Sequence, residues 1–283
     1  MERGIPVRSV SRSIAILRVI NRFGSLPLAE IARLVDLPYP TACRIMQTLI
    51  HEGLIECEPT RKRYRATALV QSLAIGFQDP NRLVHIARPY IAELTQKIAW
   101  PVSIGTRVGP SMIVRDSTHS ETSLTFTNYN PGYTFPLLES ATGHAYLAYA
   151  SDDELASILK GIELIEGPSS MLAMFQSGKL IERIRQEGHA IFDRSLHTPT
   201  PGKTSSISVP LFQNEKLVAT LTMTVFSSAM TMQEAVARHV GDLKQTAQRI
   251  NHALHDIWAG EHPVTVGGAL YDNGGDDAGQ RVH

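Results

Sequence analysis

Two groups of polar side chains near the start of the chain could bind a nucleic acid. Four residues that can donate hydrogen bonds recur at helical spacing and would share one face of a helix: Thr41, Arg44, Gln47 and Thr48. Three consecutive cations follow at Arg61, Lys62 and Arg63. Donors on a helix can read base edges in the major groove, whereas clustered cations suit phosphates. These residue types and their spacing point to double-stranded DNA.

The elements that must position these groups are two helices followed by a hairpin. Apolar spacing predicts a helix from Leu28 to Val35, a short turn, and a second helix that carries the four donors. Gly53 would end this helix, and strands at 54–58 and 64–68 would flank a polar turn. The order predicts a winged helix-turn-helix, whose second helix enters a groove while the hairpin contacts flanking phosphates.

Each of these features alone has an ordinary explanation, since polar helix faces and basic hairpin turns are usually just solvated. The charge distribution favours the DNA-binding interpretation. The chain holds 27 basic and 27 acidic residues, yet residues 1–65 contain 11 basic and 6 acidic ones, a net charge of +5. The remainder nets −5. We therefore expect a DNA-facing domain followed by a more acidic domain that would not bind a polyanion.

After residue 100 the pattern changes to strands interleaved with helices. Strands are expected at 102–108, 112–116, 124–127, 191–194, 203–212 and 216–226. Such runs predict an α+β fold, with a mostly antiparallel sheet covered by helices. The expected organisation is a DNA-binding domain at 7–68, a linker helix at 69–80, a second domain at 81–258 and a disordered tail at 259–283.

Hydroxyl side chains recur in the last two predicted strands. Thr220, Thr222 and Thr224 alternate with apolar residues, and Ser206 and Ser208 do the same in the neighbouring strand. If both sets share a face, five hydroxyls line one surface. The alternative is an ordinary solvated sheet face, because Thr favours strands.

Several segments resemble the IclR family of bacterial transcriptional regulators. The segments that carry the resemblance are 7–17 (opening helix), 37–49 (recognition helix), 62–65 (wing), and 135–145 and 206–210 (effector domain). The similarity thus extends from about residue 7 to 257. It implies a GAF-like second domain and a ligand-responsive regulator of a catabolic operon.

One position departs from the family pattern. Pro40 stands where the family usually has a small hydroxyl residue, although proline suits a first helical turn. A side-chain contact from position 40 to phosphate is therefore not expected. The base contacts fall more heavily on the four donors, and Arg12 joins the wing cations as a phosphate contact.

The resemblance also implies an effector site. The implied polar and backbone contacts are Thr142, Gly143, His144, Ala145, Asp193, Ser206, Thr222 and Thr224, with Met112 and Phe126 as apolar walls. Thr142 would cap a helix beginning at Gly143, whose free N–H groups suit a carboxylate. The chain looks most like the subgroup that controls catabolism of hydroxyphenylpropionate-type aromatic acids. The expected effector is a small aromatic or other organic carboxylate.

Partners follow from the same resemblance. We expect a homodimer or a dimer of dimers on a near-palindromic operator, because paired recognition helices need paired half-sites. RNA polymerase is a further candidate partner. No cofactor or metal is expected, since Cys43 and Cys57 are too few for a zinc site by themselves. The sequence shows no long apolar run and no apolar signal segment, so the expected location is the cytoplasm.

Two rival functions remain open. A hydrolase could use His144, Asp193 and Ser206 as a triad, but no Gly-x-Ser-x-Gly elbow, phosphate-binding loop, dinucleotide fingerprint or His-Glu-x-x-His motif supports an enzyme. An architectural DNA-binding protein without an effector is the other rival. A saturable thermal shift with aromatic acids would exclude it.

Overall fold

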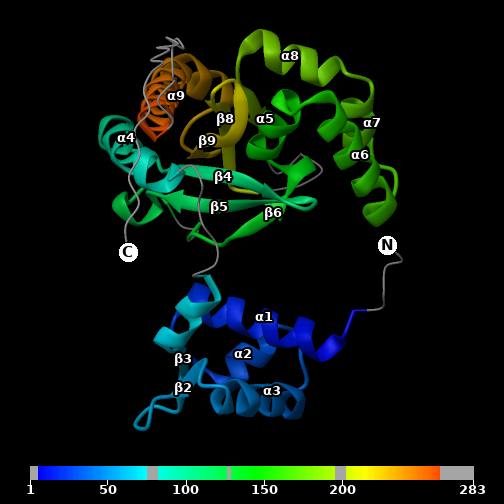
Figure 1. Cartoon of the computed structure of the whole chain (residues 1–283), viewed down its shortest axis with the longest axis vertical. Coiled ribbons are helices and arrows are strands. Elements are labelled where there is room, and N and C mark those ends of the chain that lie inside the picture. Colours follow the sequence, from blue (N-terminus) through cyan, green and yellow to red (C-terminus); the bar gives the residue numbers. More distant parts are fainter. Residues whose placement is uncertain (1–5, 75–81, 126–128, 195–201, 262–283) are drawn as a thin grey trace, which may run out of the picture.

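The computed structural model describes residues 6–74, 82–125, 129–194 and 202–261, and the side chains of the last helix as far as residue 256. Figure 1 shows the N-terminal elements as one body and the later elements as a second. The first body contains α1 (Arg8–Phe23), β1 (Leu26–Pro27), α2 (Leu28–Leu34), α3 (Tyr39–His51), β2 (Ile55–Cys57) and β3 (Arg63–Ala66). Its antiparallel sheet has the order β1-β3-β2.

The helices of this body pack around one apolar core. Ile16 and Ile20 of α1 meet Ile31 of α2 and Met46 of α3, and Ile55 of β2 closes the core. The apolar stripes read from the sequence therefore point inward, which leaves the polar face of α3 outside. The predicted winged helix-turn-helix is confirmed.

The segment after the wing differs from the linker helix expected at 69–80. Residues Ala68–Ala74 form a 3₁₀ helix, η1, in which no residue is buried. Leu69 and Leu73 remain exposed on it. Residues 75–81, the second half of the expected linker helix, lie outside the described residues.

The second body is built on a six-stranded sheet with the order β6-β5-β4-β9-β8-β7, in which every pairing is antiparallel. Its strands are β4 (Val102–Val108), β5 (Ser111–Ser117), β6 (Thr134–Pro136), β7 (Ala190–Phe192), β8 (Thr204–Gln213) and β9 (Lys216–Phe226). Its helices are α4 (Leu83–Ile98), α5 (Ala141–Tyr149), α6 (Asp152–Glu166), α7 (Ser170–Gln176), α8 (Lys179–Glu187) and α9 (Met232–Glu261), with short 3₁₀ turns η2 (His119–Glu121) and η3 (Leu137–Glu139).

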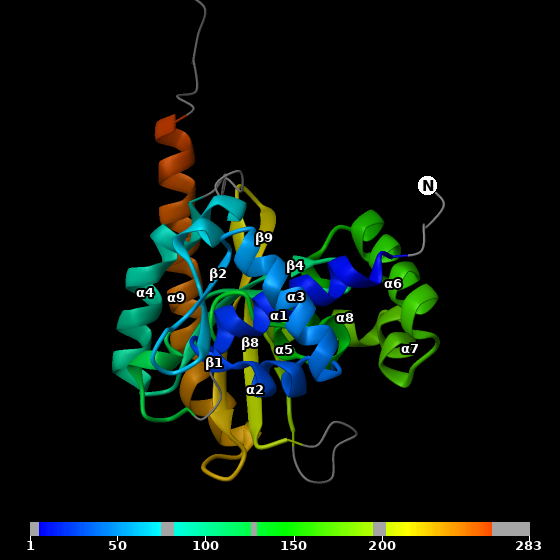
Figure 2. The same cartoon turned by 90° about the horizontal axis from the view of Figure 1, so that it is seen from below.

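Helices cover both faces of the sheet, as Figures 1 and 2 show. Ile207 of β8 and Leu221 and Met223 of β9 point to one face, where they pack with α4 and α9. The opposite face carries the hydroxyl residues and lies against α5. The predicted α+β fold is confirmed, because the alternation along β8 and β9 separates an apolar face from a polar one.

Some strands and helices differ from those expected, where the sequence pattern was weak. The strand expected at 124–127 is not formed at Leu124 and Thr125, and its remainder lies outside the described residues. Neither β6 nor α7 was expected. A bulge between Leu211 and Phe212 turns Leu217 away from the apolar set of β9 and toward the cluster around α5.

The C-terminal boundary also differs. The helix α9 continues to Glu261, beyond the boundary expected at 258. The rest of the expected disordered tail, 262–283, lies outside the described residues. Among the helices that the structure describes, none is both long and apolar enough to cross a membrane.

Candidate DNA-binding surface and effector cavity

The helix α3 presents the predicted donors on its outer face. Arg44, Gln47 and Thr48 are exposed, whereas Thr41 is half-buried. The Thr48 hydroxyl donates to the Arg44 carbonyl oxygen at 3.2 Å, so it remains available mainly as an acceptor. Pro40 occupies the first turn of α3, where its missing N–H costs no helical hydrogen bond. Arg44 and Gln47 are thus the freest side chains for base contacts.

The wing does not present its three cations equally. Arg61 and Lys62 are exposed in the turn, and Lys62 adopts a left-handed conformation with φ 48°. Arg63 instead is half-buried, and its guanidinium donates to both the hydroxyl and the carbonyl oxygen of Ser25. Ser25 in turn donates to Glu58 at 2.8 Å. Arg63 therefore fastens the wing to the loop before β1, and in this position it is less available for the phosphate contact predicted for it.

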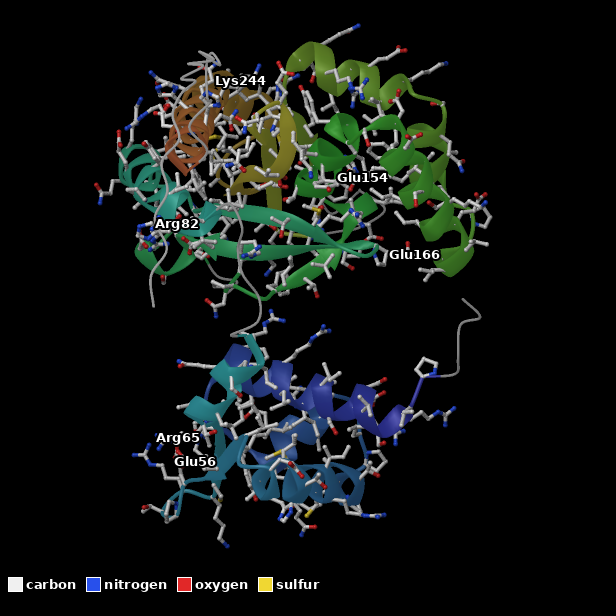
Figure 3. All side chains as sticks on the ribbon, viewed as in Figure 1. Glu56, Arg65, Arg82, Glu154, Glu166 and Lys244 are labelled. Carbon is white, nitrogen blue, oxygen red and sulfur yellow. The ribbon has the colours of Figure 1, made fainter. Side chains whose placement is uncertain are left out.

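Two further cations lie near the wing and on α1. Arg65 is exposed, and its Nε lies 2.6 Å from Oε1 of Glu56 across the hairpin. Figure 3 labels both residues. Arg12 is exposed in the first half of α1, and its role stays a prediction.

A cavity opens in the second body between the hydroxyl face of the sheet, η3–α5 and a loop before β6. Its lining residues are Ser103, Val114, Tyr129, Tyr133, Phe135, Ser140, Thr142, Arg194, Thr204, Ser206, Thr222 and Thr224. Four of the predicted effector residues are among them: Thr142, Ser206, Thr222 and Thr224. The volume open to a water-sized molecule is about 60 Å³.

The strand register explains why the hydroxyls gather. Ser206 pairs with Thr224, and Ser208 pairs with Thr222, so the five hydroxyls predicted from the two strands share one face. Deeper in the sheet, Thr222 lies 2.9 Å from both the Thr142 hydroxyl and the Ser208 hydroxyl. Ser206 and Thr224 lie nearer the open end and are half-buried. The hydroxyls thus partly line the cavity and partly form a buried network that fixes α5 on the sheet.

The N-cap of α5 lies two residues before the predicted one. Ser140, not Thr142, is the N-cap, and its hydroxyl accepts from the Gly143 N–H at 3.0 Å. The helix therefore begins at Ala141. Because Ser140 and Thr142 both line the cavity, the positive end of α5 still borders it.

Arg194 is the functional candidate that sequence reasoning missed. Among the described residues that line the cavity, it is the one charged side chain. Its guanidinium donates to the Glu139 carbonyl oxygen at 2.8 Å and lies 5.2 Å from the Phe192 ring centroid. No carboxylate of the described residues comes within 4.0 Å of it. The sequence signal that could have indicated Arg194 is its position directly after Asp193, a predicted effector residue.

Several predicted effector residues do not reach the cavity. Asp193 is exposed and accepts a hydrogen bond from Ser205, the neighbour of Ser206 on the other sheet face. Met112 and Ala145 are fully buried in the apolar cluster under α5. Gly143 is buried against η3, where an added Cβ would lie 1.9 Å from the Leu137 carbonyl oxygen. Phe126 lies outside the described residues.

His144 is held by contacts within its own domain. Its Nε2 lies 2.8 Å from the Leu138 carbonyl oxygen, and its ring packs between Phe175 and Phe192. Burial lowers the pKa of His144 to about 4, so the side chain is neutral at pH 7. His144, Gly143 and Ala145 are therefore not among the residues that line the cavity, in contrast to Thr142 on the same helix.

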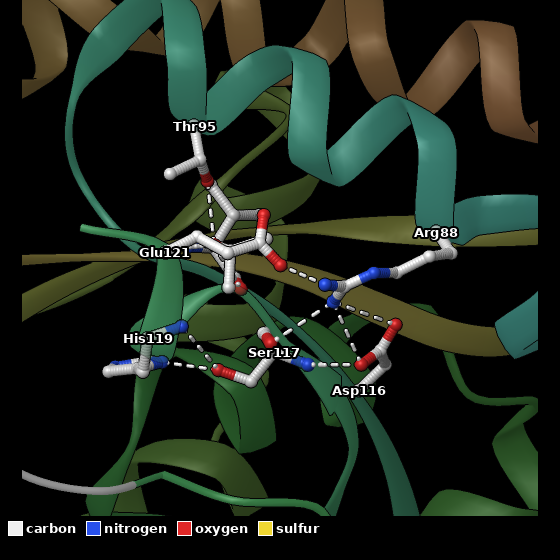
Figure 4. A network of polar contacts seen from close by, with 8 residues as sticks. Arg88, Thr95, Asp116, Ser117, His119 and Glu121 are labelled. Atoms are coloured by element: carbon white, nitrogen blue, oxygen red, sulfur yellow. Dashed lines mark hydrogen bonds and ion pairs between the residues drawn. The ribbon is translucent and has the colours of Figure 1, made fainter.

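A polar network holds the end of β5 against α4 (Figure 4). The Arg88 guanidinium bonds Asp116 and Glu121, and the Ser117 hydroxyl meets Nδ1 of His119. The His119 ring lies 4.7 Å from the ring of Tyr129, which lines the cavity. Burial lowers the pKa of His119 to about 4. The network thus supports one wall of the cavity through a neutral histidine.

The two bodies correspond to two known domains. The sequence profile for the bacterial transcriptional regulator IclR C-terminal domain matches residues 79–252, and that for the IclR helix-turn-helix domain matches 9–59. The chain belongs to the IclR family. As a member of the IclR family it is a DNA-binding transcriptional regulator with an effector-binding domain, not an enzyme.

Individual members of the IclR family are distant relatives. HTH-type transcriptional regulator TsaQ1/TsaQ2 of Comamonas testosteroni is 25% identical over 75% of this chain and 76% of its own length. DNA-binding transcriptional repressor YiaJ of Escherichia coli is 24% identical, covering 89% and 90%. A crystal structure of an IclR homolog from Microbacterium hydrocarbonoxydans, complexed with 4-hydroxybenzoate, has a TM-score of 0.63 at 18% identity, covering 87% and 98%.

The geometry agrees with the IclR assignment in one further respect. The three residues of the rival hydrolase triad each have a different environment: His144 is bound to Leu138, Asp193 to Ser205, and Ser206 lines the cavity. A nucleophile, base and orienting carboxylate must hydrogen-bond in series. These three residues are not arranged in that way.

Proposed function

We propose that this IclR-family regulator is controlled by a small organic acid whose carboxylate pairs with Arg194 in the cavity. The observation that carries the proposal is a single cation set among neutral hydroxyls, with no carboxylate of the described residues on its guanidinium. A planar guanidinium matches a carboxylate in a bidentate pair, and Ser206 and Thr224 can donate further hydrogen bonds. The positive end of α5 adds to the attraction.

An aromatic acid is the favoured member of this class. The rings of Tyr129, Tyr133 and Phe135 follow one another along the cavity, with centroid separations of 5.1 and 5.9 Å. Aromatic walls of this kind suit an aromatic ligand. The similarity to a homolog complexed with 4-hydroxybenzoate supports the same choice. The regulated genes would then serve catabolism of hydroxyphenylpropionate-type or related acids.

The output of the regulator is proposed to be operator binding through α3 and the wing. Arg44 and Gln47 would contact bases, while Arg61, Lys62 and Arg12 would contact phosphates. Two copies of the chain would place two α3 helices on a near-palindromic site.

Thermal shift and calorimetric titration of the full chain test the ligand. The panel is 4-hydroxybenzoate and 3-(4-hydroxyphenyl)propionate, each compared with its neutral amide. We expect saturable stabilisation by an acid but not by its amide. Arg194→Gln should weaken acid binding about tenfold or more, because a charge-assisted pair is lost. Arg183→Gln, an exposed arginine of α8, is the matched control and should bind normally.

Two results would count against the proposal. If the amides bound as well as the acids, or Arg194→Gln left acid affinity unchanged, the carboxylate would not lie on Arg194. If no acid stabilised the protein at all, an architectural DNA-binding protein without an effector would be the better description.

A further inference from the structure

The cavity shares one wall with the DNA-binding domain. Tyr133 lines the effector cavity, and it also lines a second cleft between the two bodies of the chain. This cleft holds about 520 Å³. From the second body it is bordered by Ile113 and residues 130–134, and from the first body by Leu34 and residues 18, 19, 21, 22 and 23. Figure 1 shows α1 as the helix of the first body that lies below β5 and β6.

Arg22 crosses this cleft to the ring of Tyr133. Its guanidinium carbon lies 4.6 Å from the Tyr133 ring centroid and 5.0 Å from that of Phe23, so both rings are within cation–π distance. The Nε of Arg22 is buried and has no hydrogen-bond partner among the described residues. The contact with Tyr133 is therefore made by the π face rather than by an ion pair.

The charge of Arg22 also reaches the cavity wall behind Tyr133. Burial raises the pKa of the Tyr129 phenol, and the charges of Arg194 and Arg22 both act against that rise. The rings of Tyr129 and Tyr133 meet edge to face at 5.1 Å. One aromatic pair thus lies between the cation proposed to bind the effector and a cation of the DNA-binding domain.

The small volume of the cavity suggests that ligand binding would displace Tyr133. About 60 Å³ is open in this structure, whereas a dry cavity that accepts benzene measures about 150 Å³. We therefore expect an aromatic acid to displace part of the wall as it binds. The Tyr133 backbone is tied to β5, since its carbonyl oxygen accepts from the Val114 N–H at 2.8 Å. With its backbone held in this way just before β6, Tyr133 would respond through its side chain.

Movement at Arg22 would reach α3 as a rigid body. Ile16 and Ile20 of α1 are buried in the core that also holds Met46 of α3, so these helices cannot shift independently. We propose that the Arg22–Tyr133 contact couples occupancy of the effector cavity to the position of the DNA-binding domain. The proposal rests on the proposed function, because it requires a ligand in that cavity.

The coupling is measured as the ratio of operator dissociation constants with and without acid. The probe is the acid of the panel above that gives the largest thermal shift, applied to the full-length chain at saturation. Wild-type protein should show a ratio of at least about fivefold, the lower range of allosteric coupling. Arg22→Gln should reduce the ratio to below about twofold, since an amide carries no charge to hold against the ring. Arg22→Lys should retain part of it.

Matched variants separate this role from general effects. Arg18→Gln removes the same charge one turn earlier on α1, in the same cleft, and should keep the wild-type ratio. Tyr133→Phe should also keep it, because the π face remains. If Arg22 only contacted DNA phosphates, Arg22→Gln would weaken operator binding equally with and without acid, and the ratio would not change.

Failure of this proposal is distinguishable from failure of the proposed function. A wild-type protein that responds to the acid, together with an Arg22→Gln protein that responds equally, would overturn the coupling role and leave the effector site intact. If no acid of the panel changed the operator affinity of the wild-type protein, the proposed function would be overturned, and the coupling role with it.

Discussion

Arg44 and Lys62 are proposed to make two kinds of DNA contact, and the loss of each should have a different effect. Arg44 projects from α3, where a side chain can enter a groove, whereas Arg61 and Lys62 lie in the turn of the wing. We expect Arg44→Ala to cost about 1–3 kcal/mol on the operator and to relax the preference at one base position. Fluorescence anisotropy with operator variants measures both. Equal loss on every sequence would contradict a base contact.

Removal of the wing cations gives the complementary prediction. The double variant Arg61→Gln with Lys62→Gln should weaken binding to all sequences and lower the salt slope by about two, because two fewer counterions are released. Arg33→Gln, an exposed cation of α2, is the control. An unchanged slope in the double variant would show that the wing does not touch phosphate.

The exposure of side chains was easier to predict from the sequence than the contacts that they make with distant residues. The exposed positions of Arg44 and Gln47 follow from helical spacing alone. Arg63 could not be placed in this way, because its partner Ser25 is 38 residues away in the chain. Arg194 was missed for the same reason: its place in the cavity depends on η3 and β7 coming together.

Two buried histidines predict how stability depends on pH. The pKa of His119 and that of His144 are both lowered to about 4 from an ordinary value of 6.5 by burial. Between these values the unfolded chain binds protons that the folded chain does not. The free energy of unfolding should therefore be intact above pH 6.5 and fall as the pH drops toward 4, by about 3 kcal/mol per histidine.

Urea denaturation between pH 7 and pH 4 measures this loss. His119→Gln should remove about half of it, while His85→Gln, an exposed residue of α4, should leave it unchanged. If the free energy of unfolding of His119→Gln fell equally steeply, other groups would control the loss of stability at low pH.

At the scale of elements, the junction between η3 and α5 determines the shape of the cavity. The family signature there was recognised from sequence, but its glycine has a packing role that sequence alone did not reveal. Gly143 lies so close to η3 that an added Cβ would meet the Leu137 carbonyl oxygen at 1.9 Å. The signature thus reports the contact of two backbones, which the Ser140 cap then fixes in register.

Gly143→Ala should consequently be destabilising by roughly 3 kcal/mol, since the backbone of η3 must move. Gly161→Ala in α6 is the matched control, because no atom lies within 4 Å of its added Cβ. There the substitution should stabilise the helix by about 0.5–1 kcal/mol. Chemical denaturation of both variants measures the contrast, and equal effects at the two sites would contradict this description of the junction.

At the scale of the whole molecule, the charge difference between residues 1–65 and the remainder of the chain follows the division into domains. The basic segment forms the winged helix-turn-helix, and the acidic remainder contains the effector-binding domain of the IclR family. This division was predictable from composition and local pattern. The contact of α1 with the wall of the cavity was not, because it joins Arg22 to Tyr133 across more than a hundred residues.

Acid binding and operator binding should oppose or assist each other within one chain. Calorimetric titration of the wild-type protein with its best acid, in the absence and in the presence of saturating operator duplex, measures this coupling. By linkage, the acid affinity must change by the same factor as the operator affinity changes with acid, at least about fivefold. Equal acid affinities with and without DNA would show that the two sites are not coupled.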